Sequence, residues 1–218
     1  MKARLDAILQ REQALYLDQL HPASEGLIAE MEADAVANRV PIADREVALF
    51  LEITARTIKA HKVLEVGMAI GYAVIHILRG MEADGQVVTI EPNEEMIRRA
   101  SEYFQRAGMS ERVRIERGLA LDVIPTLSDT FDLLYLDAMK EEYEGYLELS
   151  LPLLRTGGVV IVDNLLWGGQ VAGEIRSPDQ QQSTESLRRF NQHFVSHKNL
   201  RGVVLPVGDG LGYGVKIE

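Results

Sequence analysis

The hydrophobic pattern of the chain changes at about residue 62. Before that point the chain reads as helices, and the stretch 43–58 repeats its apolar residues at the three- and four-residue spacing of one helix face. Prolines at positions 22 and 41 interrupt this region. After it, short apolar runs typical of buried strands alternate with longer amphipathic segments. We therefore predict a helical beginning followed by alternating strands and helices.

The apolar runs predict five strands and a closing hairpin. The strands are expected at 62–67, 86–91, 113–118, 131–137 and 157–164, and helices at 71–81, 93–108, 141–154 and roughly 174–197, with a short helix that ends at 127. The hairpin joins 202–207 to 212–217. Alternating strands and helices form a parallel sheet through right-handed crossovers. We expect an α/β fold with a seven-stranded, mostly parallel sheet, an antiparallel C-terminal hairpin and helices on both faces.

Length and composition limit the possible functions. A chain of 218 residues suits one domain, here 46–218, with an N-terminal helical extension, 1–45, which we expect to lie over the functional site of that domain. A net charge of −10 disfavours broad binding to nucleic acid or anionic membranes. The chain lacks cysteine, a membrane-spanning apolar run and the apolar core of a secretion signal. We expect a cytoplasmic protein that does not bind membranes.

Two groups of basic residues have a plain interpretation. Five arginines could form a basic patch, but we interpret them as a solvated face: Arg98, Arg99, Arg112, Arg114 and Arg117. His193 and His197 have the i, i+4 spacing of some zinc sites, but they lack the intervening glutamate of H-E-x-x-H. We interpret both histidines as residues of an exposed helix.

Ligands of such sheets bind beyond the carboxyl ends of the strands. The first strand leads into a loop between Gly67 and Gly71 that lets a ligand approach the backbone, although it is not a phosphate-binding G-x-G-x-x-G. The second strand ends at Glu91, which could accept hydrogen bonds from the ribose hydroxyls of an adenosine cofactor. A plain strand–helix turn and an ordinary strand end are the alternatives. After the third strand, Ala120 and Leu121 could flank adenine or simply begin a helix.

The fourth and fifth strands end in candidate metal ligands. Asp137 ends one strand, Asp163 and Asn164 end the other, and adjacent strands bring such ends together. Two carboxylates and an amide oxygen suit Mg²⁺, Mn²⁺ or Ca²⁺ rather than zinc. Lys140 follows Asp137 by three residues. An aspartate at a strand end can also be a helix cap, which is the alternative here.

Several sequence blocks resemble one family. They are VLEVGMAIGYA (63–73), VVTIEPN (87–93), GLALDVIP (118–125), LLYLDAMKEEY (133–143), GGVVIVDNLLWGG (157–169) and VGDGLG (207–212). From about residue 40 to the end, the chain resembles the cation-dependent class I O-methyltransferases, which include catechol and caffeoyl-CoA O-methyltransferases and small bacterial relatives. The resemblance implies a Rossmann-like class I methyltransferase fold and a homodimer.

The resemblance also implies roles for individual residues. The S-adenosyl-L-methionine contacts would be Glu65, Gly67, Met68, Gly71, Tyr72, Ala73, Glu91, Pro92, Ala120, Leu121 and Asp137. Asp137, Asp163 and Asn164 would bind the metal, Lys140 would be catalytic together with Asp137, and Trp167 and Met139 would line the substrate site. Ala73 departs from the family, since many relatives have a serine there, and Met139 and Leu121 replace residues that are polar in some relatives.

These parts predict metal-dependent methyl transfer to oxygen. A phenol is mostly protonated at neutral pH, and a divalent ion bound to two neighbouring hydroxyls lowers their pKa. Lys140 could then take the proton. We expect a phenolic small molecule with vicinal hydroxyls, such as a catechol, as the acceptor. The alternatives are methylation of 5-hydroxyuridine at the wobble position of tRNA, and a non-catalytic protein that kept the fold. The negative charge favours the small molecule, and the metal set with Lys140 argues against the non-catalytic protein.

Overall fold

The computed structural model describes residues 11–20 and 23–218. Three helices come first, α1 (Arg11–Leu20), α2 (Gly26–Asn38) and α3 (Arg45–Thr57). The strands are β1 (Lys62–Val66), β2 (Gln86–Glu91), β3 (Val113–Arg117), β4 (Phe131–Leu136), β5 (Leu154–Val162), β6 (Leu200–Leu205) and β7 (Leu211–Lys216). The remaining helices are α4 (Tyr72–Gly80), α5 (Glu94–Arg106), α6 (Ala120–Val123), α7 (Tyr143–Ser150) and α8 (Gln181–Ser196).

All seven strands form one sheet in the order β3-β2-β1-β4-β5-β7-β6. The first five strands run parallel, whereas β7 is antiparallel to both β5 and β6. The predicted fold class is confirmed. Because the strand order reverses between β1 and β4, their carboxyl ends lie side by side, which is the usual position of a ligand site.

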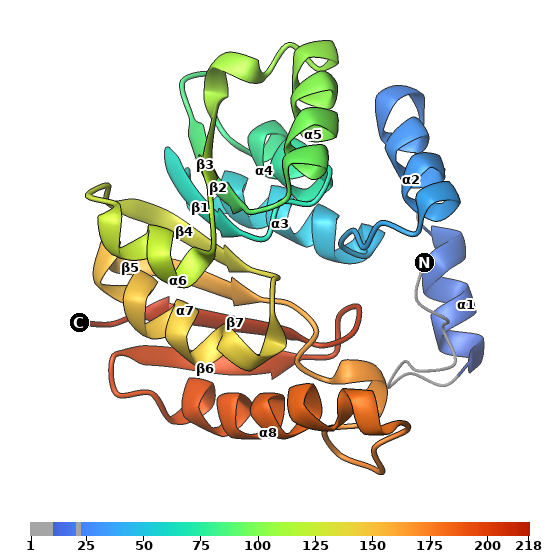
Figure 1. Ribbon diagram of the computed structural model, residues 1–218, viewed down its shortest axis with the longest axis vertical. Coiled ribbons are helices and arrows are strands. Elements are labelled where there is room, and N and C mark those ends of the chain that lie inside the picture. The colour runs from blue at the N-terminus through green and yellow to red at the C-terminus, as the bar shows by residue number, and fades with distance from the viewer. Residues whose placement is uncertain (1–10, 21–22) are drawn as a thin grey trace.

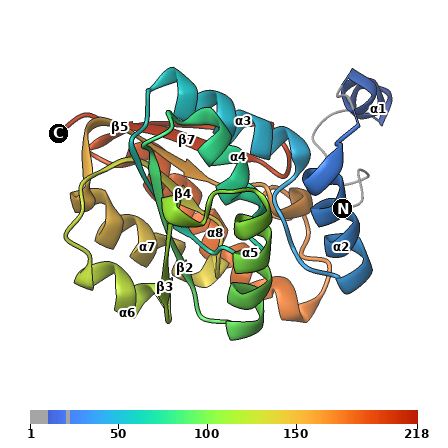
Figure 2. The ribbon, with the colours of Figure 1, turned by 90° about the horizontal axis from the view of Figure 1, so that it is seen from above.

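Helices cover both faces of the sheet (Figures 1 and 2), and a hydrophobic core lies between the sheet and each helical layer. Alternate strand residues point to opposite faces, so Val63 of β1 belongs to the core under α2, α3, α4 and α5. Its neighbour Leu64 belongs to the core under α6, α7 and α8. In the described part of the chain, no helix is both long and apolar enough to cross a membrane.

The second helix of the predicted N-terminal extension is part of the main core. Ile28, Met31 and Ala35 of α2 are buried in the same cluster as α3 and α4. Next to this buried face, Asp34 accepts hydrogen bonds from Arg99 and Tyr103 of α5, at 2.5 and 2.7 Å. Helix α1, in contrast, stands at the edge of the molecule in both views of the ribbon and leaves large apolar side chains exposed (Figures 1 and 2).

Element boundaries differ from prediction where proline and glycine intervene. The helix expected over 141–154 ends at Ser150, because Pro152 has no amide hydrogen to continue it. Strand β5 begins at Leu154 rather than at 157, and Gly157 has a φ of 75° beside a register shift between β4 and β5. Helix α8 begins at Gln181, several residues later than expected.

The five arginines that could have formed a basic patch all have acceptors. Four bind carboxylates, as in the contacts of Arg98 with Glu95 and of Arg117 with Glu94. Arg112 donates to the carbonyl oxygens of Glu82 and Gly85. The interpretation as an ordinary polar surface is therefore the better one.

Candidate active site

The loop between β1 and α4 is shaped by backbone geometry and by Glu91. Gly67, Ala69 and Gly71 have φ values of 96°, 48° and 80°. The Glu91 carboxylate accepts hydrogen bonds from the backbone N–H groups of Ala69 and Asn93, both at 3.0 Å. Each carboxylate oxygen can accept a second hydrogen bond. Two backbone hydrogen bonds therefore fix the orientation of the Glu91 carboxylate beside the loop, and its role toward a ribose stays a prediction.

The ends of β1 and β4 touch backbone to backbone. The N–H of Asp137 donates to the carbonyl oxygen of Val66 at 2.9 Å. A Cβ atom added to Gly67 would lie 2.4 Å from the carbonyl oxygen of Asp137, a distance that real Cβ atoms do not show. Glycine is required here because no side chain fits between the two strand ends.

Glu65 carries an unsatisfied oxygen in the centre of the sheet. Its side chain is fully buried, one oxygen accepts from the hydroxyl of Thr89 at 2.5 Å, and the other has no partner among the described residues. Burial raises the pKa of this carboxyl to about 8, and the charges of Asp137 and Glu91 act in the same direction. A buried acceptor of this kind is one that a cationic or hydrogen-bond-donating ligand would satisfy.

Asp163 and Asn164 are buried at the end of β5. One oxygen of Asp163 accepts from the backbone N–H and the side-chain amide of Asn164, at 2.6 and 3.2 Å. The other oxygen accepts from the hydroxyl of Tyr135 at 3.2 Å, and that hydroxyl also lies 3.5 Å from Asp137. The structure therefore brings together the three residues predicted as metal ligands, with a tyrosine hydroxyl between the two carboxylates.

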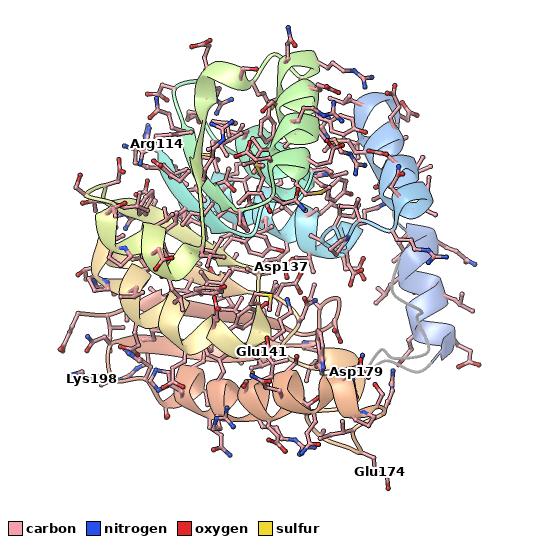
Figure 3. The ribbon with its side chains drawn as sticks, in the orientation of Figure 1. Arg114, Asp137, Glu141, Glu174, Asp179 and Lys198 are labelled. Carbon is pink, nitrogen blue, oxygen red and sulfur yellow. The ribbon has the colours of Figure 1, made fainter. Side chains whose placement is uncertain are left out.

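Lys140 is held close to the carboxyl ends of β4 and β5. Its Nζ atom lies 2.8 Å from a carboxylate oxygen of Asp137 and donates to the hydroxyl of Tyr143 at 2.7 Å. The Tyr143 hydroxyl in turn donates to the carbonyl oxygen of Asp163 at 3.1 Å. Figure 3 marks Asp137 at the end of β4, above Glu141 and helix α7. Lys140 is thus fixed beside the predicted metal ligands rather than turned towards solvent.

Both tyrosines were missed by the sequence reasoning. Burial raises the pKa of Tyr135 and of Tyr143 well above the ordinary value, and the charges of Asp137 and Asp163 raise both further. The two hydroxyls therefore stay protonated and act as hydrogen-bond donors. The available signal was their position, Tyr135 two residues before Asp137 and Tyr143 three residues after Lys140.

The residues at this end of the sheet fit a divalent cation. Asp137, Asp163 and Asn164 offer oxygen atoms only, which is the donor set that Mg²⁺, Mn²⁺ and Ca²⁺ prefer. Carboxylates also predominate at this end of the sheet, since Glu91 lies at the end of the neighbouring strand β2 and Lys140 is already paired with Asp137. This excess of negative charge suits a positively charged ligand.

The other residues predicted to contact the cofactor differ in exposure. Met68, Tyr72, Ala73 and Ala120 are buried, Leu121 is partly buried, and Pro92 is exposed. The Tyr72 hydroxyl donates to Glu32 of α2 at 2.8 Å, so in this structure it ties the glycine loop to the N-terminal extension. Burial raises the Tyr72 pKa, and the hydrogen bond to Glu32 adds to the shift.

The two predicted substrate residues lie on the loops that follow β4 and β5. Met139 is 60% exposed, as expected for a residue that could touch an acceptor. Trp167 is partly buried, adopts a φ of 48°, and its indole N–H has no acceptor among the described residues. Their roles stay predictions.

Comparison with known proteins identifies the family. A family model described as O-methyltransferase matches residues 20–217. A catechol O-methyltransferase of Mycobacterium tuberculosis (strain ATCC 25618 / H37Rv) is 34% identical over 173 residues, which cover 79% of this chain and 78% of that protein. The chain belongs to the O-methyltransferase family, and the prediction of an S-adenosylmethionine-dependent O-methyltransferase is confirmed. The match begins at residue 20, earlier than the sequence resemblance, and so includes α2 and α3.

Solved structures agree with this assignment. The cofactor-bound protein Rv0187 from MTB is 30% identical with a TM-score of 0.84, and the match covers 95% of this chain and 97% of that one. The O-methyltransferase from Bacillus cereus in complex with SAH is 26% identical with a TM-score of 0.81, covering 93% and 96%. The fold therefore matches these two proteins along nearly the whole of each chain.

Proposed function

We propose that this protein transfers the methyl group of S-adenosylmethionine to a hydroxyl of a catechol-like small molecule, with a divalent cation held by Asp137, Asp163 and Asn164. The observation that carries the proposal is the convergence of these three residues with Lys140 at the ends of β4 and β5. The similarity to a protein named catechol O-methyltransferase supports the acceptor class.

The cofactor would lie across the ends of β1 and β2. When bound, it supplies a methyl group on a positively charged sulfur. Glu91 would accept the two ribose hydroxyls, and the backbone near Gly67 would allow close approach. The unsatisfied oxygen of Glu65 would accept a hydrogen bond from the ammonium group of the methionine part of the cofactor. Ala120 and Leu121 would contact adenine.

The acceptor would bind at the ends of β4 and β5. A divalent cation there would lower the pKa of the substrate hydroxyls and fix their orientation. Lys140 would receive the departing proton at Nζ, and Tyr143 would hold that amine in position. A lysine acts as a base only when neutral, and a positive charge close by favours the neutral form. Because methyl transfer needs an in-line approach, rigid placement contributes much of the rate.

The charged surface favours a small molecule over tRNA. The candidate arginines are engaged with carboxylates or carbonyl oxygens, and the chain carries a net charge of −10. A tRNA substrate would need cations free to contact phosphates. Covering of the active site by the N-terminal extension, a homodimer and a cytoplasmic location remain part of the proposal.

A substrate screen would test this proposal. The purified protein is incubated with radiolabelled S-adenosylmethionine and Mg²⁺ or Mn²⁺, and with catechols, catechol conjugates, matched monophenols or undermodified tRNA. We expect methylated catechols, little product from monophenols, and loss of product after chelation. Methylation of tRNA alone, or turnover that persists after exhaustive chelation, would refute the proposed substrate or the proposed metal, respectively.

A further inference from the structure

Three potential metal ligands meet on the helical layer formed by α7 and α8. Glu148 of α7 lies with one carboxylate oxygen 2.7 Å from the Nε2 atom of His193 and 3.2 Å from that of His197, both at the C-terminal end of α8. One ligand atom from each residue falls within 4.8 Å of the other two. His193 and His197 share a helix face because they are four residues apart.

The interpretation of the two histidines as residues of an exposed helix fits His193 only in part and does not fit His197. The side chain of His197 is only 8% exposed, and that of His193 is 32% exposed. A third potential ligand, Glu148, comes from a different helix, which the chain order alone does not reveal.

The cluster lies far from the candidate active site. Tyr143 at the start of α7 contacts Lys140 and Asp163, whereas Glu148 lies further along that helix. In Figure 3, Lys198, the neighbour of His197, lies at the opposite end of α8 from Asp179 and is well separated from Asp137. An ion bound here could not take part directly in the reaction.

We infer that Glu148, His193 and His197 form a binding site for a divalent first-row transition metal such as Zn²⁺, Ni²⁺ or Co²⁺. Two imidazole nitrogens and a carboxylate oxygen prefer these ions, whereas the oxygen-only set of Asp137, Asp163 and Asn164 prefers Mg²⁺ or Mn²⁺. The partial exposure of His193 and Glu148 leaves space for water as a further ligand.

Metal binding requires one local rearrangement. The N–H of Asn199 donates to the Nδ1 atom of His197 at 3.2 Å, so Nε2 carries the proton and donates to Glu148. A metal on Nε2 requires the single ring proton to move from Nε2 to Nδ1, so the hydrogen bond from Asn199 must open. Asn199 lies after the end of α8, and the helix itself is unaffected. This requirement lowers the affinity of the site without blocking it.

The expected consequence of metal binding is a link between α7 and α8. Helix α7 would supply Glu148, and the C-terminal end of α8 would supply His193 and His197. An ion that binds only the folded chain stabilises that chain by mass action. At a free metal concentration 100 times the Kd, the melting temperature should rise by about 5–10 °C.

Calorimetric titration with Ni²⁺ would test this inference. The full chain is titrated in excess Mg²⁺, which occupies the oxygen-only site, and the variants His193→Ala, His197→Ala and Glu148→Gln are compared with His61→Ala. His61 is a matched control because it is an exposed histidine 3.6 Å from a carboxylate, that of Asp84. We expect one Ni²⁺ site in the wild type and in the His61 variant, and at least about tenfold weaker binding in the other three.

Two further readouts keep the inference falsifiable. Visible absorption of bound Co²⁺ should be present in the wild type and absent in His193→Ala. His193 is replaced here because it is the more exposed of the two histidines, so its loss carries the smaller risk to folding. Methyl transfer with Mg²⁺ should be unchanged in that variant, so failure here is distinguishable from failure of the proposed function. Equal Ni²⁺ binding by the wild type and His193→Ala, or Ni²⁺ binding lost only on substitution of Asp163, would overturn the inference.

Discussion

The carboxyl ends of β1 and β2 are built mainly from backbone, whereas those of β4 and β5 are built from charged side chains. In the first region the Glu91 carboxylate is fixed by two backbone N–H groups beside a glycine loop. In the second, Lys140, Asp137 and Asp163 are linked to each other through the hydroxyls of Tyr135 and Tyr143. The first region thus provides a shaped surface, and the second provides groups that can exchange protons or bind an ion.

This difference predicts different consequences of substitution. A change at β1 or β2 should alter affinity for the cofactor or the stability of the fold, because those contacts define shape. A change at β4 or β5 should alter the rate, because in the proposed mechanism those groups would act on the reacting oxygen. The following experiments would separate the two regions.

Loss of the metal should have the largest effect. Exhaustive chelation should abolish turnover, and Mg²⁺ or Mn²⁺ should restore it. Asp163→Asn should not be rescued by metal, since it removes one anionic ligand while keeping the size of the side chain. Asparagine is preferable to alanine because Asp163 is buried and accepts from Tyr135 and Asn164. Steady-state turnover and thermal melting should be measured together, and normal turnover of a folded Asp163→Asn protein would contradict the metal assignment.

Replacement of Lys140 should have the next largest effect. Lys140→Met keeps most of the side-chain bulk and removes the amine, so kcat should fall by about 10²–10⁴ while cofactor affinity changes little. Raising the pH should partly rescue the variant, because the acceptor hydroxyl can then ionise without a base. The exposed Lys198→Met serves as the control. Near-normal kcat across the pH range would remove Lys140 from the mechanism.

Glu65 should make the stability of the fold depend on pH. Because its folded-state pKa is raised to about 8 from an ordinary 4.5, its contribution to stability is fully present below about pH 4.5 and is lost as the pH rises through 8. Glu65→Gln removes this loss, so the variant should be more stable than the wild type at pH 9, by at most about 5 kcal/mol. Denaturant unfolding at pH 5 and pH 9 measures the effect. The exposed Glu111→Gln should behave as the wild type, and identical pH profiles for Glu65→Gln and the wild type would contradict the shifted pKa.

Glu91 should have the smallest effect, confined to binding. Glu91→Ala should weaken cofactor binding by ~1.5–3 kcal/mol, the range for hydrogen bonds to a charged group. Glu91→Gln should weaken it less, since the amide oxygen can still accept from a backbone N–H of the loop. Calorimetry with S-adenosylhomocysteine measures both, and unchanged affinity would place the ribose elsewhere.

The sequence predicted the residues whose position depends on strand periodicity. Asp137 and Asp163 end strands that are buried runs of apolar residues, and parallel pairing then brings those ends together. The position of Glu91 at the end of β2, beside β1, follows from the same reasoning. Such predictions need only the element type and the strand order, both of which local patterns indicate well.

Contacts that depend on packing between distant elements were not predictable in this way. Tyr135 resembles any other aromatic residue in a buried strand, and its hydroxyl contact with Asp163 depends on the stagger between β4 and β5. The meeting of Glu148 with His193 similarly depends on how α7 lies against α8. Residue type and spacing do not encode these relative positions.

The absence of a side chain at Gly67 also bears on how the enzyme could tolerate change. Because Gly67 and Asp137 are in backbone contact, any substitution there would force β1 and β4 apart at their ends. This separation would distort the proposed cofactor site and lengthen the path between methyl donor and acceptor. A Gly67→Ala protein should therefore bind the cofactor more weakly and be less stable, and the methyl group that still reaches the acceptor should be transferred poorly, because in-line displacement loses rate with misalignment.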